Sequence, residues 1–230
     1  MDITYYTNKS SSYDTNIGVD IMKLIQIALK YCKKVVCILL IILMMFNTAG
    51  VAANENKYKI DEPTKIELLN KAEIVQWYEF DKIMSFGSRF IVIDYYTGSY
   101  FVCERHMGGF HADIETIDKE ATKSLRSVYK DRENWKYRPV LIVMEDGKVY
   151  AASSFVVDHC GRDDKPFLKV VDDRSRGYGR GENYDKIKNN GMDGHICIFV
   201  EKCRNHFNGK ENPKHNANLE YLKKEKSKLN

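Results

Sequence analysis

The sequence contains no internal repeat, no Cys-x-x-Cys pair and no His-Glu-x-x-His motif. Without a Cys-x-x-Cys pair, the sequence argues against a thiolate zinc site, and without His-Glu-x-x-His it lacks a strong metal signature. The 36 Lys and Arg residues exceed the 32 Asp and Glu residues by four, a surplus too small to indicate nucleic-acid binding. With 43% apolar and 30% charged residues, the composition excludes a disordered, collagen-like or coiled-coil chain.

One long hydrophobic run near the N-terminus predicts where the protein is located. Residues 35–46 are apolar and uncharged, lysines precede them, and small residues follow. This order is that of a secretory signal peptide, with cleavage expected before Asn54. An uncleaved anchor is the alternative, because the uncharged residues 35–53 are just long enough to cross a bilayer. We therefore expect a secreted or cell-envelope protein, or a single-pass membrane protein whose only membrane contact is this segment.

The segments before and after this hydrophobic run indicate how the chain is organised, with a single domain following the signal peptide. Residues 1–21 are polar and unlike the start of a signal peptide, so Met22 is a candidate for the true start. The expected organisation is an upstream segment and signal peptide over 1–53, a linker over 54–62, one α+β domain over 63–224 and a basic tail over 225–230.

Short β-rich runs separated by turn residues predict two hairpins and one later strand. The hairpins cover 89–104 and 139–155, and the buried strand covers 195–200. Apolar spacing and capping residues predict helices over 63–77, after Asp118 and after Asn212-Pro213. Residues 174–194 are expected to be a glycine-rich loop of ordinary turns, without the context of a phosphate-binding loop. The expected fold class is α+β, with a largely antiparallel sheet of two hairpins plus the late strand and flanking helices.

Four cysteines follow the expected cleavage point, at positions 103, 160, 197 and 203. An even number in an exported domain permits disulfides, with three possible pairings. Buried free cysteines are the alternative. A cysteine-dependent transpeptidase-like enzyme would need one of these thiols to be activated, and the sequence does not indicate which.

Histidines and acidic residues cluster where the predicted strands end. If residues 111–115 are extended, His111, Asp113 and Glu115 point to one side. His159 ends the second hairpin and His206 follows the late strand, so these groups can meet in one surface cleft at the sheet rim. We expect His111, Asp113 and His206 to bind zinc or another divalent metal, and Glu115 and His159 to act as acid–base groups. The alternative is a solvated loop with a helix-capping acid.

Two further observations concern the late strand and the last helix. His195, Cys197 and Phe199 share one face of the late strand, because side chains alternate along it. His215 falls in the first turn of the last helix and is expected at the surface, although it could line the same rim.

Several segments resemble an uncharacterised exported domain of Gram-positive bacteria. They include His-Ala-Asp-x-Glu at 111–115, Gly-Tyr-Gly-x-Gly-x-Asn at 177–183 and Arg-x-His at 204–206, and the resemblance covers about residues 75–224. Relatives often carry this domain beside peptidoglycan-binding or copper-amine-oxidase-like stalk modules. The resemblance implies an envelope location and brings no activity with it. The relatives have histidine in the late strand where this chain has Phe199, which implies the loss of one candidate ligand.

Two functions are compatible with these features. The first is a secreted, metal-dependent, peptidoglycan hydrolase-like domain, degenerate if Phe199 has replaced a ligand. The second is a non-catalytic envelope module that binds wall polymer or a protein partner through exposed tyrosines. Neither interpretation involves nucleic acid.

Overall fold

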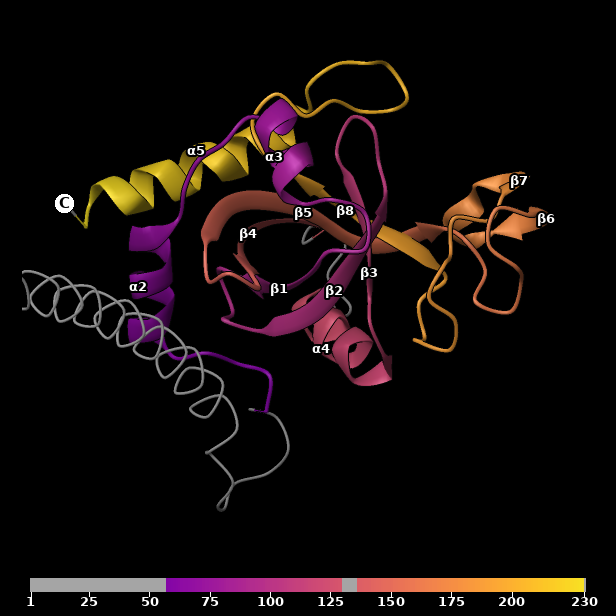
Figure 1. The fold of residues 1–230 in the computed structure, drawn as a ribbon, viewed down its shortest axis with the longest axis horizontal. Helices are drawn as coiled ribbons and strands as arrows, with labels where there is room; N and C mark the ends of the chain where they lie inside the picture. Colours follow the sequence, from indigo (N-terminus) through magenta and orange to yellow (C-terminus); the bar gives the residue numbers. More distant parts are fainter. Residues whose placement is uncertain (1–56, 130–135, 230) are drawn as a thin grey trace, which may run out of the picture. The chain divides into compact units, whose positions relative to one another are not determined.

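The fold is shown in Figure 1 as a computed structural model, which describes residues 57–129 and 136–229. The described elements belong to one compact unit, Asn54–Asn230. The predicted signal segment over 1–53 lies outside the described residues. Among the described helices, none is long and apolar enough to cross a membrane. The elements are α2 (Glu62–Lys71), α3 (Trp77–Ile83), β1 (Arg89–Asp94), β2 (Tyr100–Met107), β3 (Ala112–Thr116), α4 (Lys119–Tyr129), β4 (Tyr137–Met144), β5 (Val149–Cys160), β6 (Val170–Arg174), a 3-10 turn η2 (Ser175–Gly177), β7 (Gly179–Glu182), β8 (Gly194–Phe199) and α5 (Pro213–Ser227).

Six strands form a closed barrel in the order β1-β2-β3-β8-β5-β4, with every neighbouring pair antiparallel. The expected sheet of two hairpins plus a late strand is therefore wrong as a description of the fold. The two hairpins form, as β1–β2 and β4–β5, but β1 also pairs with β4. On the other side, β3 connects β2 to β8, and β8 pairs with β5. Closure leaves no strand edge exposed within the barrel.

Two apolar clusters stabilise the barrel, one inside it and one outside. The interior is filled by alternate residues of the strands, among them Val92, Phe101 and Ile196, which are fully buried. Outside, α2 and α5 cover a second cluster that includes Leu69 and Leu222. These two helices therefore cover one part of the outer barrel surface.

The first helix ends earlier than its apolar pattern predicts. Helix α2 ends at Lys71, and Ala72 is extended, so the helix expected over 63–77 is wrong in its second half. The chain leaves the helix because the backbone at Glu73 pairs with β5: its N–H donates to Val149 and its carbonyl accepts from Ala151, at 2.8 and 2.9 Å. The predicted starts of α4 and α5 are confirmed. Asp118 caps α4, and Asn212 caps α5.

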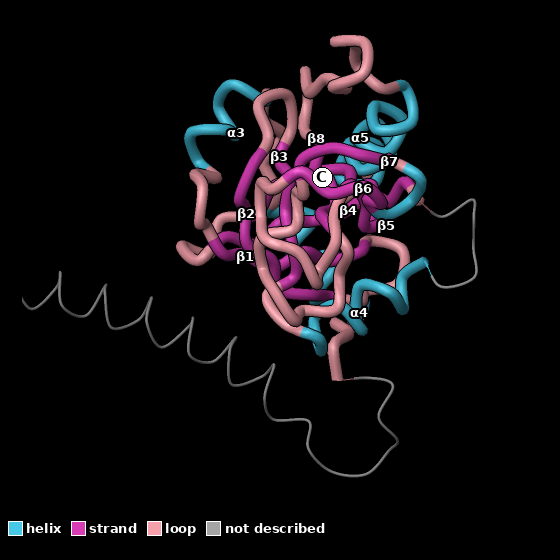
Figure 2. Tube along the Cα trace, turned by 90° about the vertical axis from the view of Figure 1, so that its right-hand side faces the viewer, coloured by secondary structure: helices cyan, strands magenta, loops and turns pink. Residues whose placement is uncertain are grey.

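The segment between β5 and β8 forms a cover over one part of the barrel. The expected glycine-rich loop over 174–194 contains β7, which pairs with β6 in a separate two-stranded ribbon. Figure 2 shows this ribbon in front of the barrel. Ser175 donates its N–H to Gly161, and Tyr184 donates its N–H to Cys160. These bonds hold the segment against the ends of β5 and β8.

All four cysteines in the described part of the chain are free and buried. The disulfides that export would permit are therefore not present in this structure. Burial in a folded domain is the alternative that the sequence left open, and cysteine is one of the residue types most often buried.

Candidate metal centre

Strand pairing places a polar face on the outside of the barrel. Asp113 of β3 lies directly opposite Cys197 of β8, and His159 of β5 lies opposite His195 of β8. A register shift in β5 between Phe155 and His159 brings the two histidines into line. Since side chains alternate across a strand, these four point outward, whereas their neighbours in sequence point into the barrel. The polar face is therefore fixed by three paired strands.

The first group of possible metal ligands consists of His111, Asp113 and His206, whose ligand atoms lie within 4.8 Å of one another. His111 Nε2 is 3.2 Å from Asp113 Oδ1, and His206 Nε2 is 4.0 Å from Asp113 Oδ2. His111 Nδ1 lies 2.9 Å from the carbonyl oxygen of Arg204. Such a carbonyl contact fixes a ligand ring so that its other nitrogen faces the ion. These three residues could hold a metal ion.

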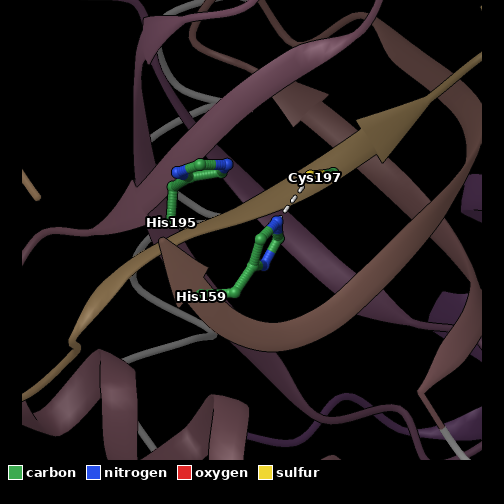
Figure 3. A group of neighbouring side chains, drawn as sticks. All are labelled: His159, His195 and Cys197. Carbon is green, nitrogen blue, oxygen red and sulfur yellow. Dashed lines mark hydrogen bonds between the residues drawn. The ribbon is translucent and has the colours of Figure 1, made fainter. Parts of the chain in front are cut away.

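The second group consists of His159, His195 and Cys197, drawn in Figure 3. His159 Nε2 faces Cys197 Sγ at 3.7 Å, which is the dashed contact in Figure 3. The other ring nitrogen of His159 lies 2.9 Å from the carbonyl oxygen of Val157. The ring of His195 lies beside that of His159, with centroids 4.5 Å apart. This group too could hold a metal ion.

Asp113 connects the two groups. Its Oδ1 lies 3.7 Å from Cys197 Sγ and 3.7 Å from His195 Nε2, in addition to its contact with His111. The residue is only 4% exposed. In the part of the chain that the structure describes, the ion-pair partners of this carboxylate are all histidines. One buried carboxylate is thus surrounded by three imidazoles and a thiol.

The charges at the centre are unevenly distributed. Burial opposes ionisation of Asp113, yet the imidazoles of His195 and His111 hold its pKa well below the ordinary value. Burial lowers the pKa of His159 to about 4, and burial likewise lowers the pKa of His195 and His206. A lowered pKa favours the neutral imidazole, which is the form that binds a metal. Burial raises the pKa of the Cys197 thiol well above the ordinary value.

The six histidines of the chain form one continuous strip over this face. Beyond the two groups, His106 lies 6.1 Å from His195 between ring centroids. At the other end, Phe199 is stacked between His111 and His215, with centroid distances of 4.2 and 3.6 Å. The expectation that His215 lies at the surface is wrong, because α5 packs it against Phe199 and leaves it 2% exposed. Phe199 therefore fills the space between two imidazoles.

Glu115 has partners that differ from those expected of an acid–base group at the metal. Its two carboxylate oxygens accept the backbone N–H groups of Lys186 and Ile187, both at 2.7 Å. Its Oε1 is 3.2 Å from His106 Nε2. Burial raises the pKa of Glu115 to about 8. The structure thus places this side chain under the covering segment, where it holds the turn at 185–187.

The surface cleft that the sequence predicts at the sheet rim is a largely covered site in the structure. His111, Asp113 and His159 are all buried, whereas the side chain of His206 is 55% exposed. The cover comes from the segment between β5 and β8: the ring of Tyr178 lies 5.4 Å from that of His159. Access to the centre from solvent is therefore through the His206 side.

The sequence missed the second group because its members are neighbours only across strands. His195 and Cys197 share a face of one strand, which the sequence shows, but the third member, His159, is 38 residues from Cys197. Their proximity depends on β5 lying beside β8, and no local pattern predicts that. One feature of the sequence could have indicated this group: within 194–199, His195 and Cys197 alternate with apolar residues and so present two possible ligands on one face of the strand.

Comparisons of this chain with models of protein families, with curated proteins and with solved structures find no match.

Proposed function

We propose that the protein binds a divalent metal, zinc in the first place, through His111, Asp113 and His206, and acts as a metal-dependent hydrolase on amide bonds of the cell envelope. One observation carries this proposal: the buried carboxylate of Asp113 has imidazoles as its only ion-pair partners within the described residues. A buried charge is costly unless it is paired or coordinates a metal. A cation at this position would supply the missing partner.

The distances are compatible with coordination. Donor atoms around a tetrahedral zinc ion, with bonds of about 2.0–2.3 Å, lie about 3.3–3.7 Å apart. His111 Nε2 and Asp113 Oδ1 are 3.2 Å apart. The ring of His206, which is half-exposed and follows β8 in a loop, must approach by less than about 1 Å to complete the group. Without a metal ion, a proton on one of the imidazoles would supply the positive charge that balances the Asp113 carboxylate.

The donor set favours zinc over magnesium or calcium. Two imidazoles and one carboxylate are typical ligands of a catalytic zinc, which keeps a fourth position open. Magnesium and calcium prefer oxygen ligands. Because the side chain of His206 is 55% exposed, an open position beside it would face solvent. When bound, zinc would polarise a carbonyl and activate water.

The chain's own residues supply positioning and a proton acceptor. The carbonyl of Arg204 orients His111, and the carbonyl of Val157 orients His159. His159 has a pKa of about 4 and is therefore a neutral base at pH 7. The substrate class, peptide cross-links of peptidoglycan, rests on the predicted export and on the resemblance to an envelope domain.

The test uses purified protein and isolated cell-wall sacculi. We expect about one zinc ion or more per chain by elemental analysis, and zinc-dependent release of free amino groups from the sacculi. His206→Ala should lose both, whereas Phe207→Ala, at a neighbouring side chain that is 98% exposed, should keep both. Sacculi that bind the protein without being cleaved would instead favour the non-catalytic envelope module. A metal-free protein that cleaves sacculi would contradict the metal-dependent mechanism.

A cysteine-dependent acyl-transfer enzyme is the second candidate, and a specific arrangement favours it. Cys197 Sγ faces His159 Nε2, and a carbonyl orients the other nitrogen of His159. A nucleophile, a base and a group that orients the base are the elements of a catalytic triad. The raised pKa of the thiol weakens this candidate, because the thiolate is the nucleophile. Activity that survives chelation and is abolished by Cys197→Ser would establish it.

A further inference from the structure

We infer that the centre holds two metal ions, with Asp113 as the bridging carboxylate and Cys197 as a thiolate ligand of the second ion. The inference rests on the proposed metal site and extends it. His111 and His206 would bind the first ion together with Asp113. His159, His195 and Cys197 would bind the second ion, so that His159 is a ligand in the two-metal form instead of the proton acceptor. Asp113 would contribute its Oδ1 atom to complete four ligands.

The position of Asp113 between the groups supports a shared carboxylate. Oδ1 is 3.7 Å from both Cys197 Sγ and His195 Nε2, the separation expected of two donors on one zinc ion. Cys197 Sγ and His159 Nε2 are also 3.7 Å apart, and the ligand atoms of His159, His195 and Cys197 all lie within 4.8 Å of one another. The same Oδ1 is 3.2 Å from His111 Nε2, and the other oxygen, Oδ2, is 4.0 Å from His206 Nε2. Both groups therefore contact the one carboxylate of Asp113, which could bridge two ions as in two-metal hydrolases, whose ions are about 3.5–4 Å apart.

The residues of the second group are held in place by the barrel. Cys197 and His195 lie on β8 and His159 on β5, so strand pairing fixes all three backbones. His195 is 4% exposed and presents Nε2 to Asp113 at 3.7 Å, so Nε2 is the nitrogen that would face the ion. Coordinating groups on rigid strands bind more selectively than groups on loops.

The thiol distinguishes the second ion from the first. Metal binding requires a thiolate, so the Cys197 S–H bond breaks, a sulfur–metal bond forms, and one proton passes to solvent for each ion bound. The first group has no thiol and would bind its ion without this proton. A soft sulfur donor also favours zinc and cobalt over magnesium and manganese. Stoichiometry, sulfur ligation and proton release are therefore three separate readouts of the same site.

Cobalt(II) titration tests the inference, because a cobalt–thiolate bond gives a charge-transfer absorption that imidazole and carboxylate ligands do not. The protein is the chain with Cys32 and Cys37 changed to serine, since these thiols lie outside the described residues and could bind cobalt themselves. We expect two cobalt ions per chain, the thiolate band, and one proton released with the second-group ion. The same counts are then measured with zinc by elemental analysis.

Three variants show which residues bind which of the two ions. Cys197→Ser should lose the thiolate band. It should bind no more than one ion with the affinity of the wild type. His206→Ala should keep the thiolate band and lower the affinity for the first ion at least tenfold. Cys203→Ser is the matched control: this cysteine is buried and only accepts a hydrogen bond from the Val200 N–H, which serine can replace. It should keep both ions and the band.

Each other outcome overturns the inference in a distinct way. One ion per chain without a thiolate band would retain the proposed metal site and remove the second ion. No tightly bound ion would remove both. A Cys197 thiol that iodoacetamide alkylates equally fast with and without bound metal would show that it is not a ligand and would favour the cysteine-dependent enzyme.

Discussion

Asp113 and Cys197 lie directly opposite each other on β3 and β8, and the thiol of Cys197 donates to the carboxylate of Asp113 with 3.7 Å between sulfur and oxygen. This pair joins the two groups of possible ligands into one centre. Each side chain has a separate imidazole partner, His111 for Asp113 and His159 for Cys197. The barrel strand pairing therefore brings the carboxylate, the thiol and two imidazoles within reach of one another.

Replacing Asp113 with asparagine should remove metal-dependent stability. If zinc binds the folded protein only, zinc at 100 times its Kd stabilises the wild type by about 2.7 kcal/mol. D113N keeps the shape of the side chain but lacks the charge, so we expect less than about 0.5 kcal/mol of stabilisation by zinc. Urea unfolding with and without zinc measures the difference. Equal stabilisation of both proteins would show that Asp113 does not bind the ion.

Replacing Gly194 with alanine should disrupt the position of His159. Gly194 has φ +106°, and an added Cβ would lie 1.9 Å from the carbonyl oxygen of His159. We expect a loss of about 3 kcal/mol or more in unfolding free energy, together with weaker metal binding. Gly147 is the control: it also has a positive φ, +81°, but open space around it, so G147A should cost about 1–2 kcal/mol and leave metal binding unchanged. Similar losses in both variants would remove the steric explanation.

The buried ion pair between Asp94 and Arg138 should be essential for folding. Arg138 donates to both oxygens of Asp94, at 2.7 and 2.8 Å, and both side chains are buried. D94N would break this buried, two-bonded ion pair, at a cost of about 3–5 kcal/mol. The exposed pair Arg89–Glu104 provides the comparison, and R89Q should cost less than about 1 kcal/mol. Chemical denaturation at pH 7 compares them, and equal costs would contradict this account.

Protonation of His215 should destabilise the fold in acid. Burial lowers its pKa to about 3, whereas the unfolded chain has the ordinary value of about 6.5. The unfolded state therefore binds more protons between these values, so the stability is complete above pH 6.5 and is lost as the pH falls toward 3. At pH 5 the loss reaches at most about 2 kcal/mol.

The variant His215→Gln isolates this contribution from those of the other buried histidines. It cannot titrate, so the difference in unfolding free energy between pH 7 and pH 5 should be smaller than in the wild type. A loss of equal size in both proteins would show that His215 does not contribute to the pH dependence. The comparison is made without added metal.

Local patterns in the sequence were sufficient for most elements of the fold. Alternating apolar residues around Gly98 and Gly147 predict the two hairpins, since a turn residue with positive φ between β-rich runs forms one. The capping residues Asp118 and Asn212 predict the starts of α4 and α5, because the side-chain oxygen accepts a free N–H of the first turn. Ribbon β6–β7 was missed, since its residues carry no apolar alternation and read as turns.

The sequence by itself determined which residue types could form a centre, and the tertiary structure decided how they combine. His111 and Asp113 are close along the chain, so their proximity is a local property of an extended segment. Closure of the barrel is not local: it depends on β3 pairing with β8 and β1 pairing with β4. That pairing brings Cys197 to Asp113 and moves Glu115 under the covering segment, because the strand next to each residue decides its neighbours.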